Sequence, residues 1–127
     1  MTAVHQGSQD LQIVEHSQES NAGDDVCVLE LTGEIDAGNA SLLTDKFNSL
    51  LGEGNQRFVI DLGGVGFMDS SGIAAMVQLF KRVRIGHGDV KLANIRPEVS
   101  RVLELLRLDR VFEVHASTDD AVESFGA

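Results

Sequence analysis

The sequence predicts an α/β fold in which a mixed, largely parallel sheet of about five strands packs against about four helices. Two observations carry this prediction. Short apolar runs alternate with segments whose apolar residues recur at helical spacing, which gives the order β-β-α-β-α-β-α-β-α. The chain has 127 residues, and it contains neither internal repeats nor a linker long enough to divide it. We therefore expect one domain with a hydrophobic core of its own.

The N-terminal part of the chain is expected to contain a tail, a short strand and a loop. Residues 1–10 are polar and predict a tail, so the domain is assigned to residues 11–127. Apolar residues within segment 11–14 predict a short first strand. Segment 17–25 is rich in Ser, Asn, Gly and Asp, which predicts a polar loop.

A longer strand and an amphipathic helix are expected next. Residues 26–31 alternate with a period of two, which predicts a strand that ends at the pair Thr32-Gly33. Segment 41–51 carries apolar residues at the spacing i, i+4, i+7, i+8 that is typical of an amphipathic helix. Ser41 and Asn39 are the candidates for the N-cap of this helix.

The middle of the chain predicts a buried strand, a second helix and a further strand. The run at residues 58–60 is apolar without alternation and leads into Asp61 and Leu62, as expected of a central strand covered on both faces. Residues 71–85 again have helical spacing, and the glycines that follow end that helix. Residues 90–93 predict the next strand.

The C-terminal part predicts a helix, a strand and a closing helix. Pro97 suits the first turn of the third helix, whose apolar stripe is formed by Val99, Val102, Leu103 and Leu106. Residues 111–114 predict the last strand. Residues 119–125 predict the closing helix, with Thr118 as its candidate cap.

Net charge limits the partners of this chain. Lys and Arg total 10 against 20 for Asp and Glu, which gives a formal net charge of -10. An acidic surface repels phosphate backbones and anionic lipids, so neither a nucleic acid nor a membrane is expected as a partner. A basic protein surface suits it better, although the acidity also serves solubility.

Cysteine content and hydropathy indicate the compartment. The single cysteine, Cys27, excludes an internal disulfide, and its apolar surroundings predict a buried small hydrophobe. Residues 1–10 lack the apolar core of a secretory signal, and no stretch has the ~20 apolar residues that span a bilayer. We therefore expect a cytoplasmic protein.

The segment most informative for function is 65–73, which joins the predicted central strand to the second helix. Asp69 or Ser70 is expected in the N-cap region of that helix, where free backbone N–H groups face outward. Ser70 and Ser71 then lie beside the positive end of the helix dipole, where a phosphate is tolerated. The alternative is an ordinary helix cap followed by Gly72, a residue that permits close packing.

Enzymatic interpretations of this segment fail on spacing. A dinucleotide fingerprint lacks its third glycine, because Asp69 stands in that position. The G-x-S-x-G elbow fails for Ser70 and for Ser71, since Met68 and Asp69 occupy the place of the first glycine. The histidines are scattered along the chain, at positions 5, 16, 87 and 115. Neither catalysis nor a metal site is therefore expected.

A second candidate segment, residues 31–36, ends the alternating strand. Gly33 is expected to permit a tight change of direction there. Glu34 and Asp36 are expected to project near the end of the sheet, on either side of Ile35. The alternative interpretation is a pair of solvated loop carboxylates that precede a helix.

Taken together, these segments resemble the STAS domain, specifically the bacterial anti-anti-sigma factors, which are anti-sigma factor antagonists. The resemblance covers residues 11–125 in the expected order. The matching pieces are residues 31–36, 58–62, 67–73 and 95–97. The departures are the tail and the 17–25 loop, which looks longer than the tight first hairpin of that family.

The resemblance implies a regulatory switch rather than an enzyme. Ser70 would accept phosphate from a partner that is both anti-sigma factor and serine kinase, of the histidine-kinase-like ATPase type, with Ser71 as the second choice. Asp36, Asp69 and Gly72 would join the two serines in partner contact. The unphosphorylated form would bind the anti-sigma factor and release the sigma factor, and a PP2C-type phosphatase would restore that form. The ATP belongs to the kinase, so no cofactor is expected in this chain.

The family also leaves an alternative open. Related STAS domains serve as scaffold or sensor modules in transport or stressosome-like complexes, without direct sigma control. Those relatives often lack the phosphorylatable serine, and its presence here favours the switch. The resemblance does not decide the oligomeric state, the sigma factor or the signal.

Overall fold

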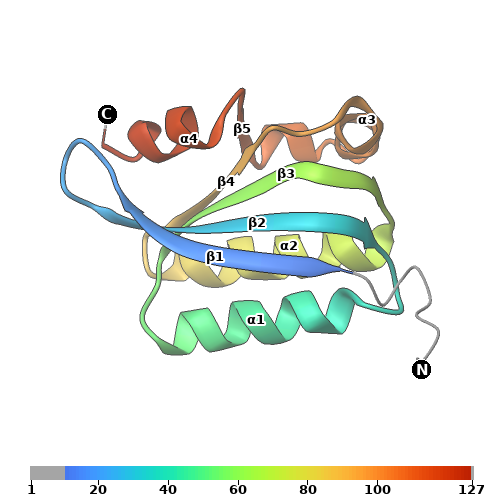
Figure 1. Ribbon diagram of the computed structural model, residues 1–127, viewed down its shortest axis with the longest axis horizontal. Coiled ribbons are helices and arrows are strands. Elements are labelled where there is room, and N and C mark those ends of the chain that lie inside the picture. The colour runs from blue at the N-terminus through green and yellow to red at the C-terminus, as the bar shows by residue number, and fades with distance from the viewer. Residues whose placement is uncertain (1–10, 127) are drawn as a thin grey trace.

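The strands of the sheet lie side by side in chain order, β1-β2-β3-β4-β5 (Figure 1). The computed structural model describes residues 11–126, so the predicted tail of residues 1–10 lies outside the described residues. Described elements are β1 (Gln12–Glu19), β2 (Asp25–Ile35), α1 (Ala40–Gly52), β3 (Arg57–Met68), α2 (Ser70–Ile85), β4 (Asp89–Ala93), α3 (Pro97–Leu105), η2 (Leu108–Arg110), β5 (Glu113–His115) and α4 (Thr118–Ser124). The predicted element order is confirmed, with one 3-10 helix, η2, in addition.

The sheet is mixed and mostly parallel, as predicted. β1 pairs with β2 in an antiparallel hairpin, whereas each later pair of neighbours is parallel. β3 is the central strand, and its residues Phe58, Val59 and Ile60 are completely buried. Phe58 and Ile60 join the larger apolar cluster, and Val59 joins a smaller one. This confirms a central strand that is covered on both faces.

The helices divide between the two sides of the sheet. Figure 1 shows α1 and α2 on one side, and α3 and α4 on the other. The larger apolar cluster includes Leu43 and Phe47 of α1 and Met76 and Leu79 of α2. The smaller cluster places Ala121 and Val122 of α4 over the sheet residues Val26, Val28, Val59 and Ala93. Cys27 belongs to the larger cluster, and burial raises the pKa of its thiol to about 11, as expected of a buried small hydrophobe.

The first hairpin is tighter than the sequence suggested. β1 continues to Glu19, which pairs with Asp25, so the predicted loop at residues 17–25 is wrong at its start. The connection is residues 20–24, where the Ser20 hydroxyl accepts a hydrogen bond from the Asp24 backbone N–H at 3.1 Å. Polar residues form the end of β1 because both of its sides there are largely exposed to water.

β2 extends past its predicted end. The strand continues through Gly33 to Ile35, with shifts of its pairing register on β3 between Glu30 and Thr32 and between Thr32 and Glu34. Gly33 has a φ of 121°, a backbone conformation that favours glycine. The glycine therefore permits an irregularity within the strand rather than a change of direction. This irregularity breaks the period-two pattern, which explains the early predicted end.

Predictions at the helix ends need three corrections. Ser117, not Thr118, caps α4, because the Ser117 hydroxyl accepts a hydrogen bond from the Asp120 N–H at 3.0 Å. Asn39 occupies the N-cap position of α1, but its side chain makes no capping hydrogen bond, and Ser41 lies inside the helix. Leu106 follows the end of α3 and is half exposed, so it does not extend the buried stripe.

The last predicted strand is displaced along the chain. β5 spans Glu113–His115, whereas Val111 and Phe112 precede it. Phe112 is buried and packs edge-on against the ring of Phe80 from α2, with 5.4 Å between ring centroids. The apolar residues that suggested a strand therefore serve as a packing segment between η2 and β5.

Candidate functional site

The two segments singled out in the sequence meet at one end of the sheet. β2 and β3 are parallel there, and Ile35 pairs with Met68. The backbone N–H of Asp69 donates a hydrogen bond to the carbonyl of Ile35 at 3.0 Å. The end of β2, which leads to Asp36, is thus fixed beside the start of α2, which carries Ser70. Carboxyl ends of parallel strands and the helices that follow them are frequent places for functional residues.

Asp69 forms the N-cap of α2. Its carboxylate accepts a hydrogen bond from the N–H of Ser71 at 2.8 Å and a longer one from the N–H of Gly72 at 3.4 Å. These bonds satisfy two N–H groups that the first turn of a helix leaves free. The prediction that the cap lies at Asp69 or Ser70 is therefore resolved in favour of Asp69.

The two serines differ in their access to solvent. Ser70 is the first residue of α2 and is exposed, whereas Ser71 is half-buried. Ser71 lines one side of a groove of about 370 Å³ between α1 and α2, whose apolar walls include Phe47 and Leu79. Ser70 is therefore the more accessible of the two serines.

Gly72 lets α2 approach the ends of the two strands. A Cβ atom at this position would lie 2.6 Å from Cγ of Met68 and 2.7 Å from Cγ2 of Ile35. Contacts this short are repulsive, so a larger residue would push the helix outward. Gly72 itself is buried, which gives it a packing role in the site. Its predicted place in partner contact stays a prediction.

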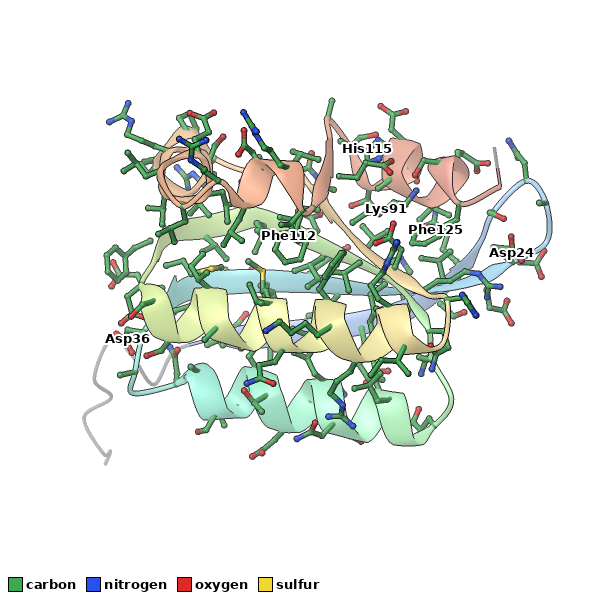
Figure 2. The ribbon with its side chains drawn as sticks, turned by 180° about the vertical axis from the view of Figure 1, so that it is seen from behind. Asp24, Asp36, Lys91, Phe112, His115 and Phe125 are labelled. Carbon is green, nitrogen blue, oxygen red and sulfur yellow. The ribbon has the colours of Figure 1, made fainter. Side chains whose placement is uncertain are left out.

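Asp36 is presented by a hydrogen-bonded loop. Its carboxylate accepts from the N–H of Gly38 at 2.9 Å, and its own N–H donates to Oδ1 of Asn39 at 3.0 Å. The Asn39 side chain also donates to the carbonyl of Glu34 at 2.7 Å, and this asparagine is completely buried. Figure 2 shows Asp36 near the first turn of α2. Asn39 is thus a site-organising residue that the sequence suggested only as a helix cap.

The end of the sheet carries several carboxylates without neutralising cations. Glu34 is exposed, and Asp36 and Asp69 are partly exposed. Among residues 11–126, no Lys, Arg or His side chain forms a salt bridge with any of these three carboxylates. The same part of the chain contains no group of three or more metal-ligating side chains. Within the described residues, these three carboxylates are therefore not paired with a cation, although the Arg96 guanidinium lies near Gly66.

A second polar cluster, which the sequence did not reveal, lies under α4. Lys91 of β4 is buried, and its Nζ donates to Oγ of Ser124 at 2.7 Å and to Oε1 of Glu113 at 3.3 Å. The same ammonium lies 4.3 Å from the centroid of the Phe125 ring (Figure 2). Nε2 of His115 lies 2.8 Å from the same carboxylate oxygen, Oε1 of Glu113. We call Lys91, Glu113, His115, Ser124 and Phe125 the Lys91 cluster.

Glu113 is the residue whose titration this cluster changes most clearly. Burial raises the pKa of its carboxyl group, but hydrogen bonds from His115 and Lys91 together outweigh that effect. The pKa of Glu113 is consequently lowered from its ordinary value of 4.5. The cluster favours the ionised carboxylate, as expected of a residue that holds two structural elements together.

Comparison with known proteins identifies the family of this fold. The sequence profile of the STAS domain matches residues 18–121. An anti-sigma-B factor antagonist of Bacillus subtilis is 30% identical over 75% of this chain and 86% of its own length. The chain described here contains no helix long and apolar enough to cross a membrane within residues 11–126.

Solved structures share the same fold. The crystal structure of an anti-sigma factor antagonist from Mycobacterium paratuberculosis superimposes with a TM-score of 0.76 at 22% identity, covering 91% of this chain and 96% of that one. A sulfate transporter family protein from Wolinella succinogenes gives a TM-score of 0.66 at 16% identity, covering 79% and 83%. At such identities the structures establish the fold alone. The family profile and the sequence relative establish more: the chain belongs to the STAS domain family.

Proposed function

We propose that this protein is an anti-sigma factor antagonist whose affinity for its partner is controlled by phosphorylation of Ser70. In this proposal the unphosphorylated form binds an anti-sigma factor that is also a serine kinase, and the sigma factor is released. The observation that carries the proposal is an exposed serine hydroxyl on the first residue of α2, beside unpaired carboxylates. The Bacillus subtilis relative, an anti-sigma-B factor antagonist, supports the same class of function.

Phosphorylation is a group transfer in which the chain supplies only the nucleophile. Oγ of Ser70 forms a bond to the γ-phosphorus of ATP held by the kinase. The bond from that phosphorus to the β–γ bridging oxygen breaks, ADP leaves, and a base of the kinase takes the hydroxyl proton. A PP2C-type phosphatase reverses the change by transferring the phosphoryl group to water. The protein itself needs no cofactor and performs no catalysis in this scheme.

The consequence of phosphorylation is local. A phosphoserine adds about -1.5 to -2 charges, which is a modest change on a chain whose net charge is already -10. Screening at physiological salt acts over about 8 Å, so distant charges hardly contribute. The phosphate would lie beside Asp69, whose carboxylate already accepts from the first free N–H groups of α2. Few donors are left to compensate the new charge.

An uncompensated charge of this kind weakens binding. Leaving a charge unpaired in an interface costs about 2 to 5 kcal/mol. That corresponds to a loss of affinity of about 30-fold to several thousand-fold. No refolding is required, because the added group acts at the surface where the partner docks. The proposal places the protein in the cytoplasm, where a sigma factor and its regulators act.

The experiment that tests this proposal locates the phosphate. The purified protein is incubated with ATP and each candidate anti-sigma factor kinase of the histidine-kinase-like ATPase type, and the product is analysed by mass spectrometry. We expect one phosphate, on Ser70, and none in the Ser70→Ala variant. Phosphate on another residue, or none with any of these kinases, would contradict the proposal. Recovery of transporter subunits instead of a kinase in a pull-down would favour the scaffold function.

A further inference from the structure

Beyond the end of β4, one edge of β3 has no partner strand within the described residues. β4 pairs with β3 only up to the pair Asp61 and Ala93. β3 continues for several residues beyond that point and pairs there with β2 alone. The extension carries three glycines, at positions 63, 64 and 66, which provide no side chains to cover their neighbours. The one large apolar side chain in this extension that is exposed is Phe67.

The backbone fixes the direction in which the Phe67 ring points. Residues in register on parallel strands project from the same face of the sheet, and successive residues project from opposite faces. Ile35 and Met68 are in register and are 0% and 2% exposed, so they face the core. Glu34 and Phe67 are also in register, and both are exposed. The ladder therefore holds an aromatic ring and a carboxylate together on the solvent side.

Phe67 differs from the other phenylalanines of the chain. The chain has six, and all lie within the described residues. The other five are buried or partly buried, whereas the Phe67 side chain is 48% exposed. Phe67 is also absent from both apolar clusters and from the partly buried residues packed on them. The ring thus contributes little to the core for a residue of its size.

The position of Phe67 connects it to the proposed phosphorylation site. It lies three residues before Ser70 along extended backbone, which corresponds to roughly 10 Å. An ordinary interface buries about 800 Å² on each partner, so one docking protein can cover both residues. Aromatic residues held on rigid elements are frequent binding anchors, because little side-chain freedom is lost when they dock. Three carboxylates surround Phe67, those of Glu34, Asp36 and Asp69. One cation is also near, because the Arg96 guanidinium would lie 3.9 Å from a Cβ atom placed on Gly66.

We propose that Phe67 is the aromatic anchor of the anti-sigma factor contact, inserting into an apolar pocket whose rim carries Lys or Arg residues that face Glu34 and Asp36. This inference rests on the proposed function, because the partner is the same. Charge complementarity is the reason for choosing this partner over a second copy of the chain. A second copy would bring three carboxylates from each chain face to face, with only Arg96 of each chain near them among the described residues, which is unfavourable. Phosphorylation of Ser70 would then act at the edge of the pocket contact.

The test compares three variants for binding to purified anti-sigma factor kinases of the histidine-kinase-like ATPase type, measured by calorimetry. Phe67→Ala removes the anchor, and Phe67→Leu keeps part of its apolar area. Leu105→Ala is the matched control, because Leu105 is a 77% exposed apolar residue at the end of α3. We expect Phe67→Ala to weaken binding about 30-fold or more, Phe67→Leu to weaken it less, and Leu105→Ala to stay within about twofold.

Several outcomes would overturn the inference, and they can be told apart. If the parent protein binds a kinase and Phe67→Ala binds it equally well, the anchor is refuted while the proposed function stands. If the parent binds none of these kinases, the proposed function and the anchor fail together. If Phe67→Ala only converts a dimer of the parent to a monomer, the ring is covered by a second copy. Unchanged thermal unfolding of Phe67→Ala ensures that lost affinity does not reflect lost folding.

Discussion

The site around Ser70 and the Lys91 cluster differ in whether their charged side chains have partners of opposite charge. At the Ser70 end of the sheet, Glu34, Asp36 and Asp69 face solvent without a basic partner. Under α4, the buried ammonium of Lys91 is surrounded by a carboxylate, a hydroxyl and an aromatic ring. Buried charges need such compensation, whereas exposed ones are solvated by water. The Lys91 cluster joins β4, β5 and the end of α4, whereas the carboxylates at the Ser70 end form no salt bridge among residues 11–126.

This comparison predicts that substitutions in the two regions have different consequences. A change at the Ser70 end should alter binding and leave the free energy of unfolding nearly constant. A change in the Lys91 cluster should do the reverse. The predictions below run from the largest expected effect to the smallest, and each can break that separation.

The largest effect is expected from a charge at Ser70. Ser70→Asp places one negative charge beside Asp69, and we expect it to lower affinity for the anti-sigma factor by about 30-fold or more. Ser70→Ala is the matched control and should bind like the unphosphorylated parent at all times. Both variants should unfold within about 0.5 kcal/mol of the parent, because the residue is exposed. Equal affinities of the two variants for the anti-sigma factor would contradict the prediction that charge at the Ser70 end controls binding.

A smaller effect, on stability, is expected from Lys91. Lys91→Ala removes the ammonium from Ser124, Glu113 and the Phe125 ring. We expect a loss of about 2 kcal/mol in the free energy of unfolding, reduced from the value for a fully buried pair because Glu113 is half exposed. Urea denaturation measures this loss. Lys91→Met, which keeps the apolar stem, should lose less, and unchanged kinase binding by both variants is required.

An effect of about 1 kcal/mol distinguishes two neighbouring residues at the start of α4. Ser117→Ala removes the capping hydroxyl, which typically destabilises a protein by about 1 kcal/mol. Thr118→Val removes only the hydrogen bond to Asp61, 3.1 Å long, and should destabilise by a smaller amount. Thermal unfolding of both variants measures the difference. A larger loss for Thr118→Val would mean that the Asp61 contact, rather than the cap, fixes α4.

The smallest effect concerns pH. The pKa of Glu113 is lowered from 4.5 in the folded chain, so ionised Glu113 stabilises the fold above pH 4.5. This contribution is lost as the pH falls below 4.5 through the lowered value. Glu113→Gln should therefore lose stability near neutral pH and show a weaker dependence of stability on pH below 4.5. The effect is modest because the side chain is half exposed. An identical pH dependence of stability in parent and variant would show that ionised Glu113 does not stabilise the fold.

Strands and helices whose apolar residues follow a regular local pattern could be predicted from the sequence. The unbroken apolar run at 58–60 became the central strand, and the helical spacing at 71–85 became α2, with its cap at Asp69. Parallel pairing of β2 with β3 then brings residues 31–36 beside 65–73. The roles predicted for Ser70 and Asp36 come from the resemblance to a known family rather than from physics alone.

Features that arise from long-range contact could not be predicted. Lys91 stands in a five-residue strand, and nothing near it in the sequence indicates that residues 113, 124 and 125 surround it. Asn39 is predicted as a helix cap because it lies just before the predicted helix. Its side-chain amide instead accepts a hydrogen bond from the Asp36 N–H and donates one to the Glu34 carbonyl. Both residues are polar and buried, a combination that composition and periodicity do not reveal.

The measurement that tests the central claim most directly is the affinity of the anti-sigma factor for the same protein before and after phosphorylation. Parent protein phosphorylated on Ser70 by its kinase, with the site verified by mass spectrometry, is titrated against the anti-sigma factor beside the unmodified parent. Our account predicts that the phosphorylated form binds at least about 30-fold more weakly, while Ser70→Ala treated with the same kinase and ATP keeps its affinity. Equal affinity of the two forms of the parent would contradict it.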